Sequence, residues 1–165
     1  MLKKIVLFAC LLFSVGAFAQ DKIAYFNSAE VIQAMPEFVT MQDSLQKTQA
    51  AVEAEMKVLE EEYSKKYTAF MAEGEGLVES IKVRRMQEIQ DIAQRAETFQ
   101  QQSQQQMQQL YEQLMTPIQQ KVREVLTVVG TENNYTYILE ATSILFVNPS
   151  APNATPQVKA KLGLQ

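Results

Sequence analysis

Apolar residues recur every three or four positions over most of the chain, which is the period of an amphipathic α-helix. One such run covers residues 37–71 without an internal proline or glycine, and a second covers residues 78–129. Between them, Ala72–Gly76 contains two glycines, whose backbone freedom permits a tight reversal. The pattern therefore predicts an antiparallel helical hairpin about 50 Å long. Pro117 is expected to kink the returning helix.

Three short segments outside the hairpin have the composition of β-strands, being rich in β-branched and aromatic residues. They are residues 22–27 (KIAYFN), 135–140 (YTYILE) and 144–147 (ILFV). We expect Asn133-Asn134 to end the long helix, because asparagine tolerates the left-handed conformation. Residues 141–143 should turn the chain between the last two strands. One strand precedes the hairpin and two follow it, so a sheet that joins them would bring both ends of the chain together.

Two short helices are predicted beside the strands. Ser28 is expected to cap the first, which should end near Met35 because Pro36 disfavours the α conformation in the residue before it. Thr155 is expected to cap the second, with Pro156 at its first position. The predicted fold class is α+β and mostly α. It consists of a small β-rich oligomerisation body, with a long antiparallel α-helical hairpin inserted between the first and second strands.

The first 19 residues have the features of a cleavable export signal. Lys3 and Lys4 precede the apolar run IVLFACLLFSV, and Ala17-Phe18-Ala19 is a small-x-small cleavage site. The alternatives are an uncleaved membrane anchor or a lipoprotein signal at Cys10. A lipoprotein signal is disfavoured because Cys10 lies inside the apolar run rather than at its end. The chain is therefore predicted to be exported.

These elements define three regions along the chain. We assign residues 1–19 to the signal peptide and residues 38–117 to the helical hairpin, with its tip near 72–77. Residues 20–37 and 118–165 are assigned to the body.

Composition narrows the range of functions. The chain has no histidine, and its single cysteine lies in the predicted signal. Cys/His zinc sites, histidine-assisted nucleophiles and disulfides are therefore excluded. No glycine-rich phosphate loop follows a strand, so we predict neither an enzyme nor a bound cofactor or metal. Removing the signal takes the net charge from −4 to −6. This acidity argues against a nucleic-acid partner and allows at most transient membrane contact.

Apolar residues gather in the half of the hairpin nearest its tip, where two helices alone cannot cover all of them. Methionine and tyrosine suit the binding of varied partners because their side chains adapt to different surfaces. The alternative is that these residues only pack the two helices together. Tyr67, Met71 and Leu77 lie off the inward stripe and are the best candidates to face outward. The full candidate set is Met56, Leu59, Tyr63, Tyr67, Phe70, Met71, Leu77, Val78 and Ile81.

The predicted body has a thin core, because three short strands and two small helices bury little surface. Bulky residues on the strands suggest that several subunits combine their sheets. The candidate interface residues are Ile23, Tyr25, Phe26, Tyr137, Ile138, Leu139 and Phe146.

Residues 99–113 are mostly glutamine, although they lie within the second helical run. Glutamine has good helix propensity but adds little to an apolar core. The inward stripe is reduced here to Phe99, Ser103, Met107 and Leu110. One hypothesis is that the thinned stripe makes this part of the hairpin compliant. The alternative is a composition preference without a mechanical role.

Element order and several local stretches resemble the Skp/OmpH family of periplasmic chaperones. The matching stretches are residues 22–27, Pro117-Ile118 through Lys121-Val122, and residues 134–141 (NYTYILEA). The resemblance spans essentially the whole chain after the predicted signal. It implies a homotrimer in which the bodies join and three helical hairpins, the tentacles, enclose a cavity.

The same resemblance implies an ATP-independent periplasmic holdase that binds unfolded outer-membrane proteins and prevents their aggregation. One feature departs from the family, whose best-known members have strongly basic tentacles. Residues 38–129 here hold 10 Lys/Arg and 14 Asp/Glu, a net charge of −4. The net negative charge leaves open whether these tentacles capture clients electrostatically, as basic tentacles can. The alternative function is a structural coiled-coil spacer or tether in the cell envelope.

Overall fold

The structure is a computed structural model that describes residues 22–164, so the predicted signal peptide lies outside the described residues. The chain forms two compact units. We call the unit Ile32–Lys121 the arm. The other unit, the body, consists of the described residues up to Val31 together with those from Val122 onward.

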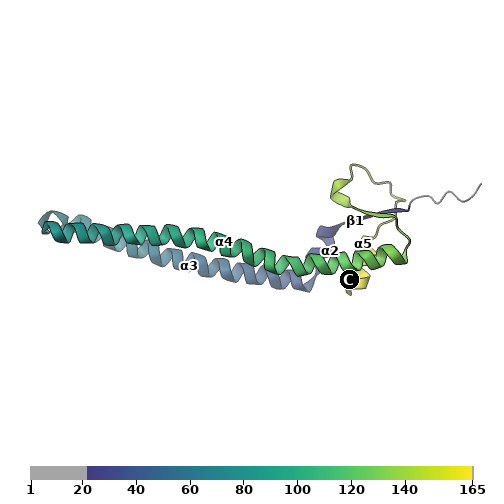
Figure 1. Ribbon diagram of the computed structural model, residues 1–165, viewed down its shortest axis with the longest axis horizontal. Helices are drawn as coiled ribbons and strands as arrows, with labels where there is room; N and C mark the ends of the chain where they lie inside the picture. Colours follow the sequence, from purple (N-terminus) through teal and green to yellow (C-terminus); the bar gives the residue numbers. More distant parts are fainter. Residues whose placement is uncertain (1–21, 165) are drawn as a thin grey trace, which may run out of the picture. The chain divides into compact units, whose positions relative to one another are not determined.

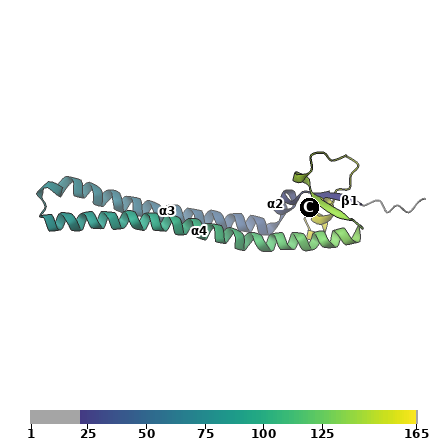
Figure 2. The same cartoon turned by 45° about the horizontal axis from the view of Figure 1, so that its top comes forward.

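The arm is the helical hairpin that the sequence predicts. Helix α3 (Pro36–Glu73) and helix α4 (Glu79–Glu132) lie side by side, as Figures 1 and 2 show from two directions. A short 3-10 turn, η2 (Gly74–Gly76), reverses the chain between them. Pro36 begins α3, a position that suits proline because the first turn needs no backbone donor. Helix α4 continues through Pro117 and contributes its last turns to the body.

The core of the arm follows the inward stripe of both helices. Its buried apolar residues are Met35, Met41, Leu59, Ile89, Ile92, Met115 and Ile118. Ser103 is also buried, at the level of the glutamine-rich stretch. The stripe predicted from periodicity contains most of these positions. The two residues outside it are Met35, which precedes α3, and Met115, whose neighbour Leu114 matches the three-to-four-residue spacing.

The body contains a two-stranded sheet made of the segments that flank the hairpin. Strand β1 (Ile23–Phe26) pairs in parallel with strand β2 (Tyr137–Glu140), and their register runs from Ile23 opposite Tyr137 to Phe26 opposite Glu140. The hairpin is therefore inserted between the first and second strands, as predicted. The second strand is two residues shorter at its start than the sequence suggested.

The prediction of a third strand at residues 144–147 is wrong. A 3-10 turn, η3 (Ala141–Ser143), leads into these residues, which have no regular structure. The second edge of β1 is instead taken by a later loop. The Tyr25 backbone N–H donates to the Pro152 carbonyl at 3.0 Å, and the Ala154 N–H donates to the Tyr25 carbonyl at 2.8 Å. With both edges of β1 occupied, residues 144–147 cannot pair with it.

Both short helices form, but their caps differ from the prediction. Helix α2 covers Ser28–Ala34, and its capping acceptor is the Asn27 side chain, whose Oδ1 accepts from the Glu30 N–H at 3.0 Å. Helix α5 covers Thr155–Leu162. Thr155 does not cap it, because its hydroxyl accepts from the Asn27 N–H at 3.0 Å. Asn27 can cap α2 because it precedes the helix, where its side-chain oxygen reaches the Glu30 N–H. The residue at the same position before α5 is Ala154, which makes no side-chain capping bond.

The core of the body lies between the sheet, α5 and the last turns of α4. Its buried apolar residues are Ala24, Phe26, Val31, Val122, Val129, Ala154 and Val158. Helix α4 ends at Glu132, and Asn134 adopts a left-handed conformation with φ 53°. The predicted asparagine stop is therefore confirmed.

Candidate functional site

The tip-proximal part of the arm exposes apolar side chains on its surface. Of the nine residues predicted to bind partners, Met71 is 63% exposed and Val78 is 67% exposed. Tyr63 and Tyr67 are also exposed. Four more are half-buried: Met56, Phe70, Leu77 and Ile81. We call the exposed set Tyr63, Tyr67, Met71 and Val78 the arm patch.

Leu59 differs from the other eight candidates because it is buried in the hairpin core, with 7% exposure. It packs the two helices together in this conformation and does not belong to the exposed surface. Leu77 was expected to face outward, yet it is half-buried while its neighbour Val78 is exposed. Successive helix and turn residues point in different directions, so one position decides which side chain is covered.

Two residues of the arm patch form an ordered aromatic surface. Tyr63 and Tyr67 are one helical turn apart on α3, and their rings stack with centroids 5.9 Å apart and planes 7° from parallel. Neighbouring aromatic rings four residues apart stabilise each other on a helix. The stack therefore holds apolar area at the surface in a fixed orientation.

A second exposed apolar region lies on α4, outside the binding residues predicted from the sequence. Val83 and Met86 are exposed, and together with Phe70 they line a shallow recess of about 400 Å³. The spacing of Val83 and Met86 is one helical turn, but they lie off the inward stripe that Ile81 and Ile89 define. The sequence signal that identifies them is a pair of apolar residues on a face of α4 other than the inward stripe.

An open groove separates the two helices at the level of the glutamine-rich stretch. Its volume is about 990 Å³. The lining residues are Leu45, Gln49, Val52, Glu53, Met56, Lys57 and Glu60 from α3, and Gln100, Ser103, Gln104, Met107, Gln108 and Tyr111 from α4. Four of these residues are glutamines, and the buried Ser103 contributes only a small side chain. The thinned stripe noted in the sequence is therefore a groove in the arm.

Compliance of this part of the arm remains a prediction. Fewer apolar contacts across the groove should permit more frequent local opening. We expect backbone amides of residues 100–109 to exchange hydrogen about tenfold faster than those of residues 118–128, which include buried Ile118 and Val122. Native-state hydrogen exchange measured by mass spectrometry or NMR tests this. Equal protection in the two segments would contradict it.

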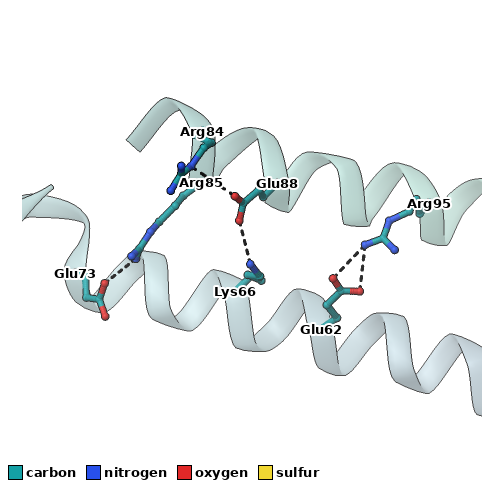
Figure 3. A network of polar contacts seen from close by, with 7 residues as sticks. All are labelled: Glu62, Lys66, Glu73, Arg84, Arg85, Glu88 and Arg95. Carbon is teal, nitrogen blue, oxygen red and sulfur yellow. Dashed lines mark hydrogen bonds and ion pairs between the residues drawn. The ribbon is translucent and has the colours of Figure 1, made fainter. Parts of the chain in front are cut away.

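Toward the tip, ion pairs link the two helices (Figure 3). Arg95 reaches Glu62 at 3.1 Å, Lys66 reaches Glu88 at 3.0 Å, and Arg85 reaches Glu73 at 2.7 Å. Arg84 adds a second contact to Glu88 at 3.7 Å. Near the other end of the arm, Lys121 pairs with Glu37. The pairs that join α3 to α4 are at least partly exposed to solvent, so each contributes little to stability.

Two of these carboxylates have lowered pKa values. A hydrogen bond from Lys121 lowers the pKa of Glu37, and a hydrogen bond from Lys66 lowers the pKa of Glu88. A carboxylate with a lowered folded-state pKa stabilises the fold fully above its unfolded-state pKa, and that contribution is lost as the pH falls through the folded value. The arm should therefore lose part of its stability as the pH drops below 4.5, the ordinary value for both groups.

The Glu88→Gln substitution should reduce this acid sensitivity. The neutral amide cannot titrate, so the difference in melting temperature between neutral and acidic pH should be smaller than in the unmodified protein. The effect is small because the pair is exposed to solvent. Thermal unfolding followed by circular dichroism at pH 7 and pH 4 measures it. Glu97→Gln, outside the ion-pair network of Figure 3, is the control and should leave the difference unchanged.

The body exposes most of the residues predicted to join subunits. Ile23, Tyr137 and Leu139 are exposed, and Phe146 is 78% exposed. Tyr25 and Ile138 are half-buried. Phe26 is buried within the body, which leaves it little surface for a partner. Leu145, which is not among the predicted interface residues, is fully exposed beside Phe146.

Among the described residues, no cluster of three or more acidic, histidine or cysteine side chains could hold a metal ion. None of the described helices combines the length and apolar character that crossing a membrane requires.

Together, a small body built on a parallel two-stranded sheet and a long helical hairpin inserted between its strands define an arm-bearing α+β protein. A family model described as outer membrane protein (OmpH-like) matches residues 22–162. The chain therefore belongs to the Skp/OmpH family.

A solved structure has the same fold. It is an OmpH-like protein from Caulobacter crescentus CB15 that is named as a candidate outer membrane chaperone. The two superpose with a TM-score of 0.75 at 15% sequence identity, over 87% of this chain and 85% of that chain. No protein of curated function is significantly similar to the chain in sequence.

Proposed function

We propose that the protein is an ATP-independent holdase chaperone that binds unfolded outer-membrane proteins and prevents their aggregation. Membership of the OmpH-like family supports this function, as does the fold shared with the OmpH-like protein from Caulobacter crescentus CB15. The observation that carries it is the arm patch, together with exposed Val83 and Met86 on α4. A holdase needs apolar surface that stays accessible, and it needs no reactive group.

The binding surface that we propose consists of the arm patch with the half-buried residues beside it. Its members are Met56, Tyr63, Tyr67, Phe70, Met71, Leu77, Val78 and Ile81, and we add Val83 and Met86. Buried Leu59 is left out. Ion pairs flank this surface, and charged neighbours of this kind keep exposed apolar residues soluble.

We further propose that the bodies of three copies associate into a homotrimer. The exposed apolar residues Ile23, Tyr137, Leu139, Leu145 and Phe146 form the proposed interface. Strand β2 is at the edge of the two-stranded sheet, where its outer backbone groups are available for a neighbouring strand. Three arms would then surround a shared space. Export to the periplasm through a cleaved signal at residues 1–19 is part of the same proposal.

The function is tested by diluting a urea-unfolded outer-membrane β-barrel protein into buffer with or without purified protein that begins at Gln20. Turbidity should stay low at equimolar trimer without added nucleotide. An equal mass of an unrelated soluble protein is the control. Light scattering on the protein alone measures the oligomer. Turbidity that rises as in the control would exclude the holdase function, and the spacer function would then be favoured.

A further inference from the structure

Three glutamines form a regular row along one rim of the arm groove. Gln100, Gln104 and Gln108 follow one another at four-residue intervals on α4, and all three line the groove and are exposed. Four residues of an α-helix rise about 6 Å. The row therefore presents three side-chain amides about 6 Å apart along the groove. We call these three residues the amide row.

This spacing is close to the repeat of an extended chain. Two residues of a β-strand advance about 6.6 Å, and peptide groups that point to the same side recur at that interval. Across the amide row the two repeats differ by about 1 Å in total. A glutamine side chain has enough rotatable bonds to absorb this difference. An amide also has two donors and an acceptor, so it can bond either the N–H or the C=O of a peptide group.

The interior of the groove is apolar and adaptable. Half-buried Leu45, Val52 and Met56 line it from α3, and half-buried Met107 lines it from α4, with exposed Tyr111 beside it on the groove wall. Methionine fills differently shaped spaces at little cost. A volume of about 990 Å³ accommodates several side chains. If the peptide groups of an extended segment bonded to the amide row, every second side chain of the segment would point into this interior.

The opposite rim restricts the charge of an occupant. Glu53, Lys57 and Glu60 alternate in sign along α3 and leave one net negative charge. Gln108 already donates to Glu112 at 3.1 Å, and this exposed bond runs along α4 rather than across the groove. Exposed side-chain pairs four residues apart on a helix are weak, so a bound peptide can replace this one. The groove is therefore complementary to neutral or weakly basic segments and disfavours acidic ones.

We propose that the groove binds one extended, neutral or weakly basic segment of an unfolded chain in which apolar residues occupy every second position. The amide row bonds the peptide groups of the segment, and its alternate side chains enter between α3 and α4. This inference rests on the proposed chaperone function and specifies which part of a client the arm selects. Strand segments of β-barrels have this alternation.

The test uses two ten-residue peptides of identical composition, with blocked ends and a fluorescent label. In one, valine and threonine alternate between terminal lysines. In the other, the valines are grouped in one block. Fluorescence anisotropy with purified protein measures the affinity for each. We expect the alternating peptide to bind about tenfold more tightly than the block peptide, since only it can satisfy the row and the interior together.

The matched variants come from the glutamine-rich stretch itself. Replacing Gln100, Gln104 and Gln108 by alanine removes the amide row but keeps a helix-forming sequence. Each lost hydrogen bond is worth about a factor of two to ten, so affinity for the alternating peptide should fall about tenfold or more. The control is Gln101→Ala, Gln105→Ala and Gln109→Ala. It changes the same number of glutamines at the same spacing, one position farther round α4 and outside the groove lining.

Equal affinities for the two peptides, or equal effects of the two triple variants, would overturn the proposal. So would an amphipathic helical peptide of the same length that binds as tightly as the alternating one. The turbidity assay on the unmodified protein and the same variants distinguishes failure of the holdase function from failure of the role proposed for the groove. If the unmodified protein fails to suppress aggregation, the holdase function fails. If it suppresses aggregation while the amide row has no effect on peptide affinity, only the role of the groove fails.

Discussion

Replacing Tyr67 and Met71 together by serine is expected to weaken binding of an unfolded outer-membrane protein about tenfold or more. Both side chains are exposed on α3 one turn apart. Burying such a side chain against a partner is worth about 1 kcal/mol or more, and two of them correspond to at least a tenfold change in the dissociation constant. Titration of a labelled, urea-unfolded β-barrel protein with each variant measures the loss.

The same double substitution should leave the fold and the oligomer intact, because neither side chain is part of the arm core. Substitutions of exposed residues change stability by about 0.5 kcal/mol or less. Val39→Ser is the control, since Val39 is also exposed on α3 but lies outside the arm patch. If the double variant unfolds or dissociates, these residues belong to the structural core. If it binds clients as well as the unmodified protein, the arm patch is not the binding surface.

Val129→Asp is expected to destabilise the body by about 3–5 kcal/mol, the cost of an uncompensated buried charge. Val129 is 1% exposed and lies on the last turns of α4, in the core beneath the sheet. A domain of this size is stable by only about 5–15 kcal/mol. The melting temperature should therefore fall by roughly 10 °C or more. Thermal and urea unfolding followed by circular dichroism measure the change.

The neighbouring residue supplies a closely matched control. Val128 is 45% exposed, although it precedes Val129 in the same helix. Val128→Asp introduces the same charge at nearly the same place in the chain, but water can solvate it. We expect a change within about 0.5 kcal/mol. Equal destabilisation by the two substitutions would show that the described core does not explain the stability of the body.

These two predictions separate the parts that carry the proposed function. Changes to the arm patch should affect client binding while the body stays folded. Changes to the core of the body should affect folding and assembly, and they should affect binding only as a consequence. A variant of either kind that reverses this pattern would contradict the proposed division between a binding arm and an assembling body.

Local rules determined the helices and the turn that joins them. The three-to-four-residue period of apolar residues predicts α3 and α4, and the paired glycines predict the reversal at Gly74–Gly76. Asn134 ends α4 because it can adopt a left-handed conformation. Each of these features depends on interactions within about one helical turn, so neighbouring residues carry enough information. The family match confirms the resemblance stated from the sequence. That resemblance depended on the order of elements, which the same local patterns predict.

Contacts between distant residues decided the rest. Residues 144–147 have strand composition, but the edge of β1 that they needed is bonded to Pro152 and Ala154. Leu59 and Tyr63 are both predicted to bind partners and lie one helical turn apart, yet Leu59 is buried and Tyr63 is exposed. The glutamine-rich stretch predicts a thinner inward stripe. The groove and the position of its two rims depend instead on how α3 and α4 pack. Burial and edge pairing are properties of two surfaces together, and a pattern along one segment describes only one of them.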